Sequence, residues 1–318
     1  MVGEKLLPGG VPGSPRAGNV LTGYLLAVVN MLISGVAIYV NSLGVRLFND
    51  STLYTAAKNL VAGVVLAILA VSTGRQQARE KLTPSGWSLL LLVALIGGSV
   101  PYALYFRGLE LSTPVTASLI DHTQFLFVAT FALMFLRERL GASVWIALLV
   151  LLGGLMIGIA ASSARIDRGM PFLFGATLLF AADFIVMKLL LRSVAPLTVM
   201  TFKMGIGSVL LLLFVFATGR GGMLARLSLL QVEFVVVTGL ILVAFTATSV
   251  FGLRRASATA VTAIPAGSPI VTTALVALSQ KVEIPATRWL GFSLALLSVL
   301  AIFIVGLRTE LTPREGTV

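Results

Sequence analysis

Cysteine is absent from the 318 residues, and histidine occurs once, as His122. The absence of cysteine excludes disulfide bonds, thiolate metal sites and cysteine nucleophiles, and a single histidine argues against a histidine-rich metal site. No G-x-x-x-x-G-K-[ST] loop occurs either, which excludes ATP drive through a phosphate loop within this chain. We therefore expect neither a metal nor a cofactor.

Charged residues are also scarce. They make up 11% of the chain, against about 25% in a soluble domain, whereas 58% of the residues are hydrophobic. Apolar runs of about 20 residues, the length that crosses a hydrocarbon core, recur along the sequence without strand-like alternation, so they predict membrane helices. Ten helices are expected, over 20–43, 52–73, 87–108, 113–136, 143–162, 170–191, 198–218, 232–253, 259–280 and 287–307.

The segments outside these helices are short and carry most of the charge. Residues 1–19 are rich in proline and glycine and lack the apolar core of a signal peptide, so we expect a disordered cytoplasmic tail at 1–19. A second cytoplasmic tail is expected at 308–318. The net charge of +11 is explained by the positive-inside bias, and no nucleic-acid partner is expected. With both termini cytoplasmic, the inner segments hold 12 of the 23 Lys and Arg residues and the outer segments eight, which favours this orientation in the cell membrane.

The sequence repeats itself at an offset of 145 residues. The scarce polar residues that this offset superposes are Lys58 on Lys203, Ser112 on Ser257, Glu138 on Glu283, and 73–75 on 218–220. Matches of such residues at one offset indicate a duplication, which divides the chain into five-helix repeats at 20–162 and 170–307. Because five is an odd number, the second repeat must enter the membrane from the opposite side, so the repeats are predicted to be inverted.

Inverted repeats are typical of secondary transporters, in which the solute site lies near the bilayer midplane and two related conformations open to opposite sides. The fold class expected is therefore an all-α membrane protein of ten transmembrane helices, and the function expected is transport, not catalysis. Two alternatives stay open. One is a passive channel or exchanger for small metabolites. The other is an intramembrane enzyme, although the G-x-S-G element of a serine nucleophile is absent.

Two stretches resemble the EamA-type members of the drug/metabolite transporter superfamily. They are PVTASLIDHTQFLFVATFALMFLRERLGASVWIALLVLLGGLMIG (114–158) and ATAVTAIPAGSPIVTTALVALSQKVEIPATRWLGFSLALLSVLAIFIV (258–305). The resemblance covers about residues 20–307. It implies a ten-helix carrier, such as an exporter of amino acids or related metabolites, with a cavity formed mainly by the first, third, fourth, sixth, eighth and ninth helices. Pro269 matches a proline common in the ninth helix of the family, whereas the fourth helix has Gln124 at the equivalent position.

Ionisable side chains inside membrane helices are costly and therefore functional candidates. Asp121 and His122 lie in the middle of 113–136, where the second repeat has Ala266 and Gly267, so the scaffold does not require them. A carboxylate beside an imidazole that titrates near neutrality is a candidate for proton coupling. A polar contact between helices is the alternative for both residues.

The other intramembrane charges are Asp183, Lys188, Lys58 and Lys203. Lys188 lies five residues after Asp183, which is unfavourable for a pair within one helix, so each is expected to find another partner. Lys58 and Lys203 are predicted close to opposite surfaces, where a lysine snorkels or bridges a gate. Glu138 is expected to stabilise the start of 143–162, and Glu283 that of 287–307.

These arguments select two sets of residues. The predicted substrate-binding residues are Asp121, His122, Asp183, Gln124, Tyr102, Tyr105, Asn30 and Asn41. The predicted ion-coupling or gating residues are Asp121, His122, Lys58, Lys203 and Lys188. We expect a monomer in the lipid bilayer that exports a small polar or amphipathic metabolite, with protons as the coupling ion. The G-x-x-x-G pair Gly154 and Gly158 is expected to pack helices within the chain.

Overall fold

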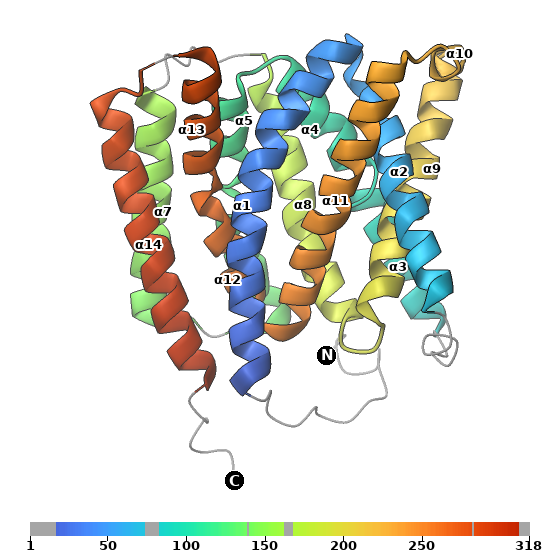
Figure 1. Cartoon of the computed structure of the whole chain (residues 1–318). Coiled ribbons are helices and arrows are strands. Elements are labelled where there is room, and N and C mark those ends of the chain that lie inside the picture. Colours follow the sequence, from blue (N-terminus) through green and yellow to red (C-terminus); the bar gives the residue numbers. More distant parts are fainter. Residues whose placement is uncertain (1–16, 74–82, 139, 162–167, 282, 312–318) are drawn as a thin grey trace.

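In the computed structural model, which describes residues 17–73, 83–138, 140–161, 168–281 and 283–311, every regular element is a helix (Figure 1). Within that part of the chain, nine segments are long and apolar enough to cross a membrane, and a shorter apolar helix lies beside them. The chain is thus a multi-pass helical membrane protein. The uninterrupted helices are α1 (Ala17–Phe48), α2 (Ser51–Ser72), α7 (Ala142–Ala161), α8 (Met170–Leu190), α9 (Pro196–Ala217), α11 (Leu229–Arg255) and α14 (Ala286–Leu311).

The helices form one bundle, with α7 packed along α14 at one side and α2 along α9 at the other (Figure 1). Between these pairs, α1 packs against α11, and α8 packs against α3 (Pro84–Ile96) and α4 (Val100–Glu110). The four-residue helix α10 (Gly221–Leu224) follows α9. The first residues of α1 and the last of α14 meet at one end of the bundle, which we call the terminal end (Figure 1).

Three of the predicted membrane helices are interrupted. The segment 87–108 consists of α3 and α4, with a break at residues 97–99. The segment 113–136 consists of α5 (Pro114–Asp121), α6 (Gln124–Phe131) and the π-helical turn η1 (Ala132–Leu136). The segment 259–280 consists of α12 (Ala258–Ala263), the 3-10 turn η2 (Ile264–Gly267) and α13 (Ser268–Gln280).

Two different local causes produce breaks at equivalent places in the two repeats. Pro265 and Pro269 supply no backbone N–H, which interrupts the second-repeat helix. The first repeat has no proline there. Instead, Thr123 Oγ1 donates to the carbonyl of Ile120 at 2.7 Å, and the His122 ring lies 2.7 Å from the carbonyl of Ser118, so side chains take over carbonyls of the last turn.

The predicted tails fall largely outside the described residues, since 1–16 and 312–318 are not described. Residues 17–19, predicted to be disordered, belong to α1, and residues 308–311, predicted to lie in the second tail, belong to α14. The reason on the α14 side is a tertiary contact, because Glu310 accepts hydrogen bonds from Tyr24 Oη at 2.9 Å and from the Ser257 backbone at 3.2 Å.

Gly154 brings α7 and α14 into backbone contact. A Cβ at this position would lie 2.7 Å from the Gly291 carbonyl, and Gly291 in turn faces the Gly154 carbonyl. We expect Gly154→Ala to cost about 1–3 kcal/mol, because backbone atoms cannot move aside as a side chain does. Thermal unfolding of the purified protein measures this cost.

The neighbouring glycine supplies the control for this prediction. A Cβ at Gly153 meets nothing within 4 Å, so Gly153→Ala should leave the melting temperature unchanged or slightly raise it. Equal melting temperatures for the two variants would show that the α7–α14 contact does not require a glycine.

Candidate functional site

A cavity lies inside the bundle between α1, α2, α4, α8, α9, α11 and the break between α5 and α6. The empty space, open solvent included, is about 780 Å³. One wall is aromatic and consists of Tyr102, Tyr105, Phe106, Phe180, Phe184 and Phe245. The polar side chains are Ser34, Asn41, Lys58, Asp121, Gln124, Lys203, Thr238, Thr246 and Ser249.

The break in the fourth predicted helix places Asp121 and Gln124 at the cavity. Asp121 is the last residue of α5 and Gln124 the first of α6, so both belong to half-helix ends inside the bundle. The Asp121 side chain is 19% exposed, and its Oδ2 lies 3.9 Å from His122 Nδ1, too far for a hydrogen bond. Asp121 therefore presents a carboxylate to the cavity that no described side chain neutralises at hydrogen-bonding distance.

Three buried polar atoms of the cavity wall have no hydrogen-bond partner in the described part of the chain. They are Tyr105 Oη, Gln124 Nε2 and Thr246 Oγ1. Buried polar groups are nearly always hydrogen-bonded in native proteins. These three atoms are therefore available to a polar solute or to water inside the cavity.

Lys58 is buried at the cavity with 1% of its surface exposed. Its Nζ lies 3.9 Å from the centre of the Phe106 ring and 3.4 Å from Asn41 Oδ1, which also accepts from Tyr54 Oη at 2.7 Å. No carboxylate of the described residues lies within 4.0 Å of it. Lys58 is held by an amide oxygen and aromatic faces, without an anion.

Lys203, the repeat equivalent of Lys58, has such an anion. Its Nζ donates to Asp183 Oδ2 at 2.5 Å, and the Asp183 side chain is fully buried. The pair packs against the break between α3 and α4, where a Cβ on Gly97 would collide with the Asp183 carboxylate and a Cβ on Gly98 with the Lys203 carbonyl. The prediction that Lys58 and Lys203 snorkel is wrong, since both side chains point into the bundle rather than to a surface.

Four predicted site residues do not line the cavity. His122 contacts Ser118 of α5, Ser34 of α1 at 3.3 Å and Ser268 of α13 at 2.8 Å, so it joins three helices. Asn30 donates to Phe245, Thr248 and Ser249 of α11. Asp183 reaches the cavity only through Lys203, and Lys188 lies beyond it toward the terminal end.

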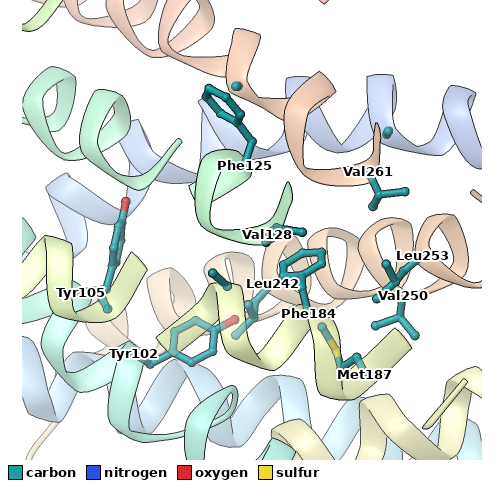
Figure 2. Close-up of a cluster of buried hydrophobic side chains, with 14 of the residues drawn as sticks. Tyr102, Tyr105, Phe125, Val128, Phe184, Met187, Leu242, Val250, Leu253 and Val261 are labelled. Atoms are coloured by element: carbon teal, nitrogen blue, oxygen red, sulfur yellow. The ribbon is translucent and has the colours of Figure 1, made fainter. Parts of the chain in front are cut away.

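An apolar cluster closes the cavity toward the terminal end (Figure 2). Phe184 and Val250 line the cavity, and Met187 and Leu253, about one turn farther along α8 and α11, are fully buried. Val128 of α6 and Val261 of α12 complete the cluster. These six side chains are called the plug.

Polar side chains hold the junction between α11 and α12 beyond the plug. Lys188 Nζ donates to the carbonyls of Leu253 and Ala256, both at 2.6 Å. Glu138, predicted to stabilise the start of the following helix, instead accepts from the Ala258 backbone at 2.8 Å and from Thr259 Oγ1 at 3.0 Å, across the chain. A cation thus lies at the end of α11 and an anion at the start of α12, where the helix dipoles favour them. Glu310 accepts a hydrogen bond from the Ser257 backbone at the same junction. The side chains of Lys188, Glu138 and Glu310 are called the latch.

The plug is not repeated at the opposite end, where Tyr54 instead packs with Phe48, Phe106 and Phe234. The offset of 145 relates Met187 to Ser42, Leu253 to Gly108, Val261 to Thr116 and Val128 to Thr273, so four of the six plug positions hold small or polar residues there, whereas Phe184 and Val250 correspond to Tyr39 and Tyr105. A second hollow lies at this end between α1, α4 and the start of α5, lined by residues that include Ser42, Arg46, Leu109, Glu110 and Pro114. Glu283, the equivalent of Glu138, is exposed and bonds none of the described residues.

Sequence reasoning missed most of the wall that α8 and α11 contribute. On α11, Thr238, Thr246 and Ser249 are eight and three residues apart, a spacing that puts hydroxyl groups on one helix face. That periodicity was the available signal. Phe180 and Phe184 gave none, because an apolar residue in a membrane helix faces lipid as readily as a cavity.

A bundle of membrane helices around a partly polar cavity is typical of membrane-transport proteins. The EamA-like transporter family model matches the chain twice, at residues 21–159 and 167–304. The chain belongs to this family.

Two further comparisons agree with this assignment. The "Uncharacterized transporter in cobO 3'region" of Sinorhizobium sp. is 26% identical over 108 residues, which are 34% of this chain and 76% of that protein. A solved crystal structure of a protein with 18% identity superposes with a TM-score of 0.68 over 93% of this chain and 99% of that chain, which shows a shared fold.

Proposed function

We propose that this protein is a secondary active transporter that exports a small polar or amphipathic metabolite, such as an amino acid, by alternating access. The observation that supports this most is the asymmetric closure of one cavity. The plug and the latch close its terminal end, while a separate hollow lies at the opposite end. A carrier needs such a state together with a second state closed at the other end.

The packing of the helices favours a second state of this kind. The offset of 145 residues relates α1 to α8 and α11 to α3 and α4, so the contact of α1 with α11 corresponds to the contact of α8 with α3 and α4. It also relates α2 to α9 and α7 to α14, and the members of each of these pairs contact each other. Inverted five-helix repeats would produce this pattern. The proposal includes ten transmembrane helices, a monomer in the cell membrane and a cytoplasmic terminal end.

Counterflow of labelled solute in proteoliposomes tests alternating access. Proteoliposomes preloaded with unlabelled solute should accumulate external label transiently. The reason is that a carrier that releases unlabelled solute outside binds labelled solute there and returns with it. A thermal-stability screen of amino acids, nucleosides, sugar phosphates and cationic drugs selects the solute. Flux without saturation or counterflow would indicate a passive channel and contradict the proposal.

Asp121 is proposed to bind the solute or the coupling ion. Because its carboxylate faces the cavity, Asp121→Asn should weaken ligand stabilisation and transport at least about tenfold, the lower range for losing a charged contact. His122→Gln serves as the control for ligand stabilisation only, which it should leave unchanged, since His122 joins helices outside the cavity. Unaltered binding and transport in Asp121→Asn would remove Asp121 from the site.

Proton coupling through Asp121 and His122 is part of the proposal. Uptake with an imposed pH gradient should exceed uptake without one, and the Asp121→Asn variant should lose the difference. Wild-type transport that is indifferent to the gradient would exclude protons as the coupling ion.

A further inference from the structure

We infer that Lys58 is the anion site of the cavity and that the transported solute carries a carboxylate, which binds Lys58 in the place that Asp183 occupies on Lys203. This inference deepens the proposed function and rests on it. The chemical class that it names is an acid whose apolar body lies against the aromatic wall.

The two repeats provide the first argument. The offset of 145 residues relates Lys58 to Lys203, and it relates Ile38 of α1 to Asp183 of α8. In the second repeat these positions hold an ion pair. In the first repeat the lysine is kept, but an isoleucine stands where the carboxylate would be. Ile38 and Lys58 both line the cavity.

The surroundings of Lys58 provide the second argument. An ammonium group removed from water requires compensation. Lys58 has one amide oxygen at 3.4 Å and three aromatic rings, of which Phe106 is the nearest. Asn41 already accepts a shorter hydrogen bond from Tyr54. A charged oxygen at the open side of Lys58 would supply the missing charge-assisted bond.

Among the charged side chains of the cavity, Lys58 is the one that can bind an anion. Lys203 also lines the cavity, but it is neutralised by Asp183. Asp121 forms no ion pair with Lys58, since the described residues contain no such contact within 4.0 Å. A solute with a carboxylate and an ammonium group can therefore bind Lys58 at one end and Asp121 at the other.

Binding of matched acids and amides tests the inference. We would measure thermal stabilisation of the full-length protein by leucine, isoleucine, valine, methionine, phenylalanine and tryptophan, each beside its carboxamide. At least one acid should bind, and its amide should bind at least about tenfold more weakly, as for loss of a buried charge pair. Equal affinities within every pair, or binding by none of the acids, would overturn the inference.

Lys58→Met should abolish the preference for the acid without harming the fold. Replacing an unpaired buried cation by an apolar side chain of similar length removes a desolvation cost, so the variant should melt no lower than the ligand-free wild type. A variant that is folded and still prefers the acid as strongly as the wild type would contradict the inference.

Ile38→Asp tests the same site by adding a carboxylate instead of removing the lysine. It recreates in the first repeat the carboxylate that Asp183 provides in the second, so it should pair with Lys58 and reduce the affinity for the acid at least about tenfold. Ile38→Asn, of nearly the same size but uncharged, is the control and should retain the preference for the acid. Equal affinities for the acid in Ile38→Asp and Ile38→Asn would contradict an anion site at Lys58.

The inference and the proposed function fail in different ways. If an uncharged solute shows counterflow that Lys58→Met does not change, the transporter proposal stands and the anion site at Lys58 is rejected. If an acid binds in a Lys58-dependent way but shows no counterflow, the anion site stands and the proposal of alternating access is rejected.

Discussion

Replacing Asp183 by asparagine is expected to lower the free energy of unfolding by about 3–5 kcal/mol, the cost of leaving a buried charge without its partner. The Asp183 carboxylate is fully buried and bonds Lys203 at 2.5 Å, beside the backbone of Gly97. The amide of asparagine cannot neutralise the ammonium group that remains. Thermal and denaturant unfolding in detergent measure the loss.

A double-mutant cycle separates the ion pair from simple loss of packing. Lys203→Met alone should also destabilise the protein, because it leaves the Asp183 carboxylate buried. The double variant Asp183→Asn/Lys203→Met should be more stable than either single variant, since no isolated charge remains. Additive losses in the double variant would show that the two side chains contribute independently.

The comparison of the two related lysines sharpens this prediction. Lys203→Met removes one partner of a pair, whereas Lys58→Met removes a cation that has no carboxylate. The first variant should therefore melt lower than the wild type and the second should not. Similar destabilisation by both would indicate that Lys58 has a structural role like that of Lys203.

Lys188→Met is expected to open the terminal end, and to raise the reaction rate of a cysteine introduced at Val261 by about 10- to 150-fold. Val261 belongs to the plug and is 2% exposed, and the chain contains no native cysteine. Lys188 donates two bonds of 2.6 Å to the α11–α12 junction. Lys188→Met removes both bonds, and loss of even one charge-assisted bond is worth about 1.5–3 kcal/mol, which gives this range of populations as a minimum. The measurement uses a thiol reagent that does not cross membranes, added at the terminal end.

The glutamates related by the repeat provide a matched control. Glu138→Gln weakens the bonds to Ala258 and Thr259 and should also speed the reaction at Val261. Glu283→Gln removes the same charge at an exposed position without partners among the described residues, so the rate should not change. Equal rates in the wild type, Lys188→Met and Glu138→Gln would show that the latch does not hold the terminal end closed.

The closure at the terminal end depends largely on side chains that differ between equivalent positions of the two repeats. Met187 and Leu253 fill the terminal end, while Ser42, the equivalent of Met187, lines the second hollow at the opposite end. The offset was readable from the sequence, but its consequence was not. Which positions face one another across the bundle depends on how α8 and α11 pack, and membrane helices carry no apolar periodicity that would reveal it.

The helix breaks show a similar limit. Pro265 and Pro269 made an interruption of the ninth predicted helix foreseeable. The equivalent interruption beside Gln124 was not, because it depends on side chains of His122 and Thr123 bonding their own backbone. Ser and Thr make similar bonds in unbroken helices, as Thr238 does to Phe234 in α11. The sequence alone cannot distinguish the two cases.

Composition, the length of the apolar runs and the 145-residue offset by themselves determined that this is a multi-pass helical protein with two related halves. They also singled out the few intramembrane charges, because the cost of burying a charge makes each of them conspicuous. The tertiary structure alone decided the partners. It paired Asp183 with Lys203, placed Lys188 on backbone carbonyls, and put no carboxylate of the described residues beside Lys58. The physical reason is that pairing depends on contacts between helices that lie far apart in the chain, and the helices of one chain contact only a few of the others.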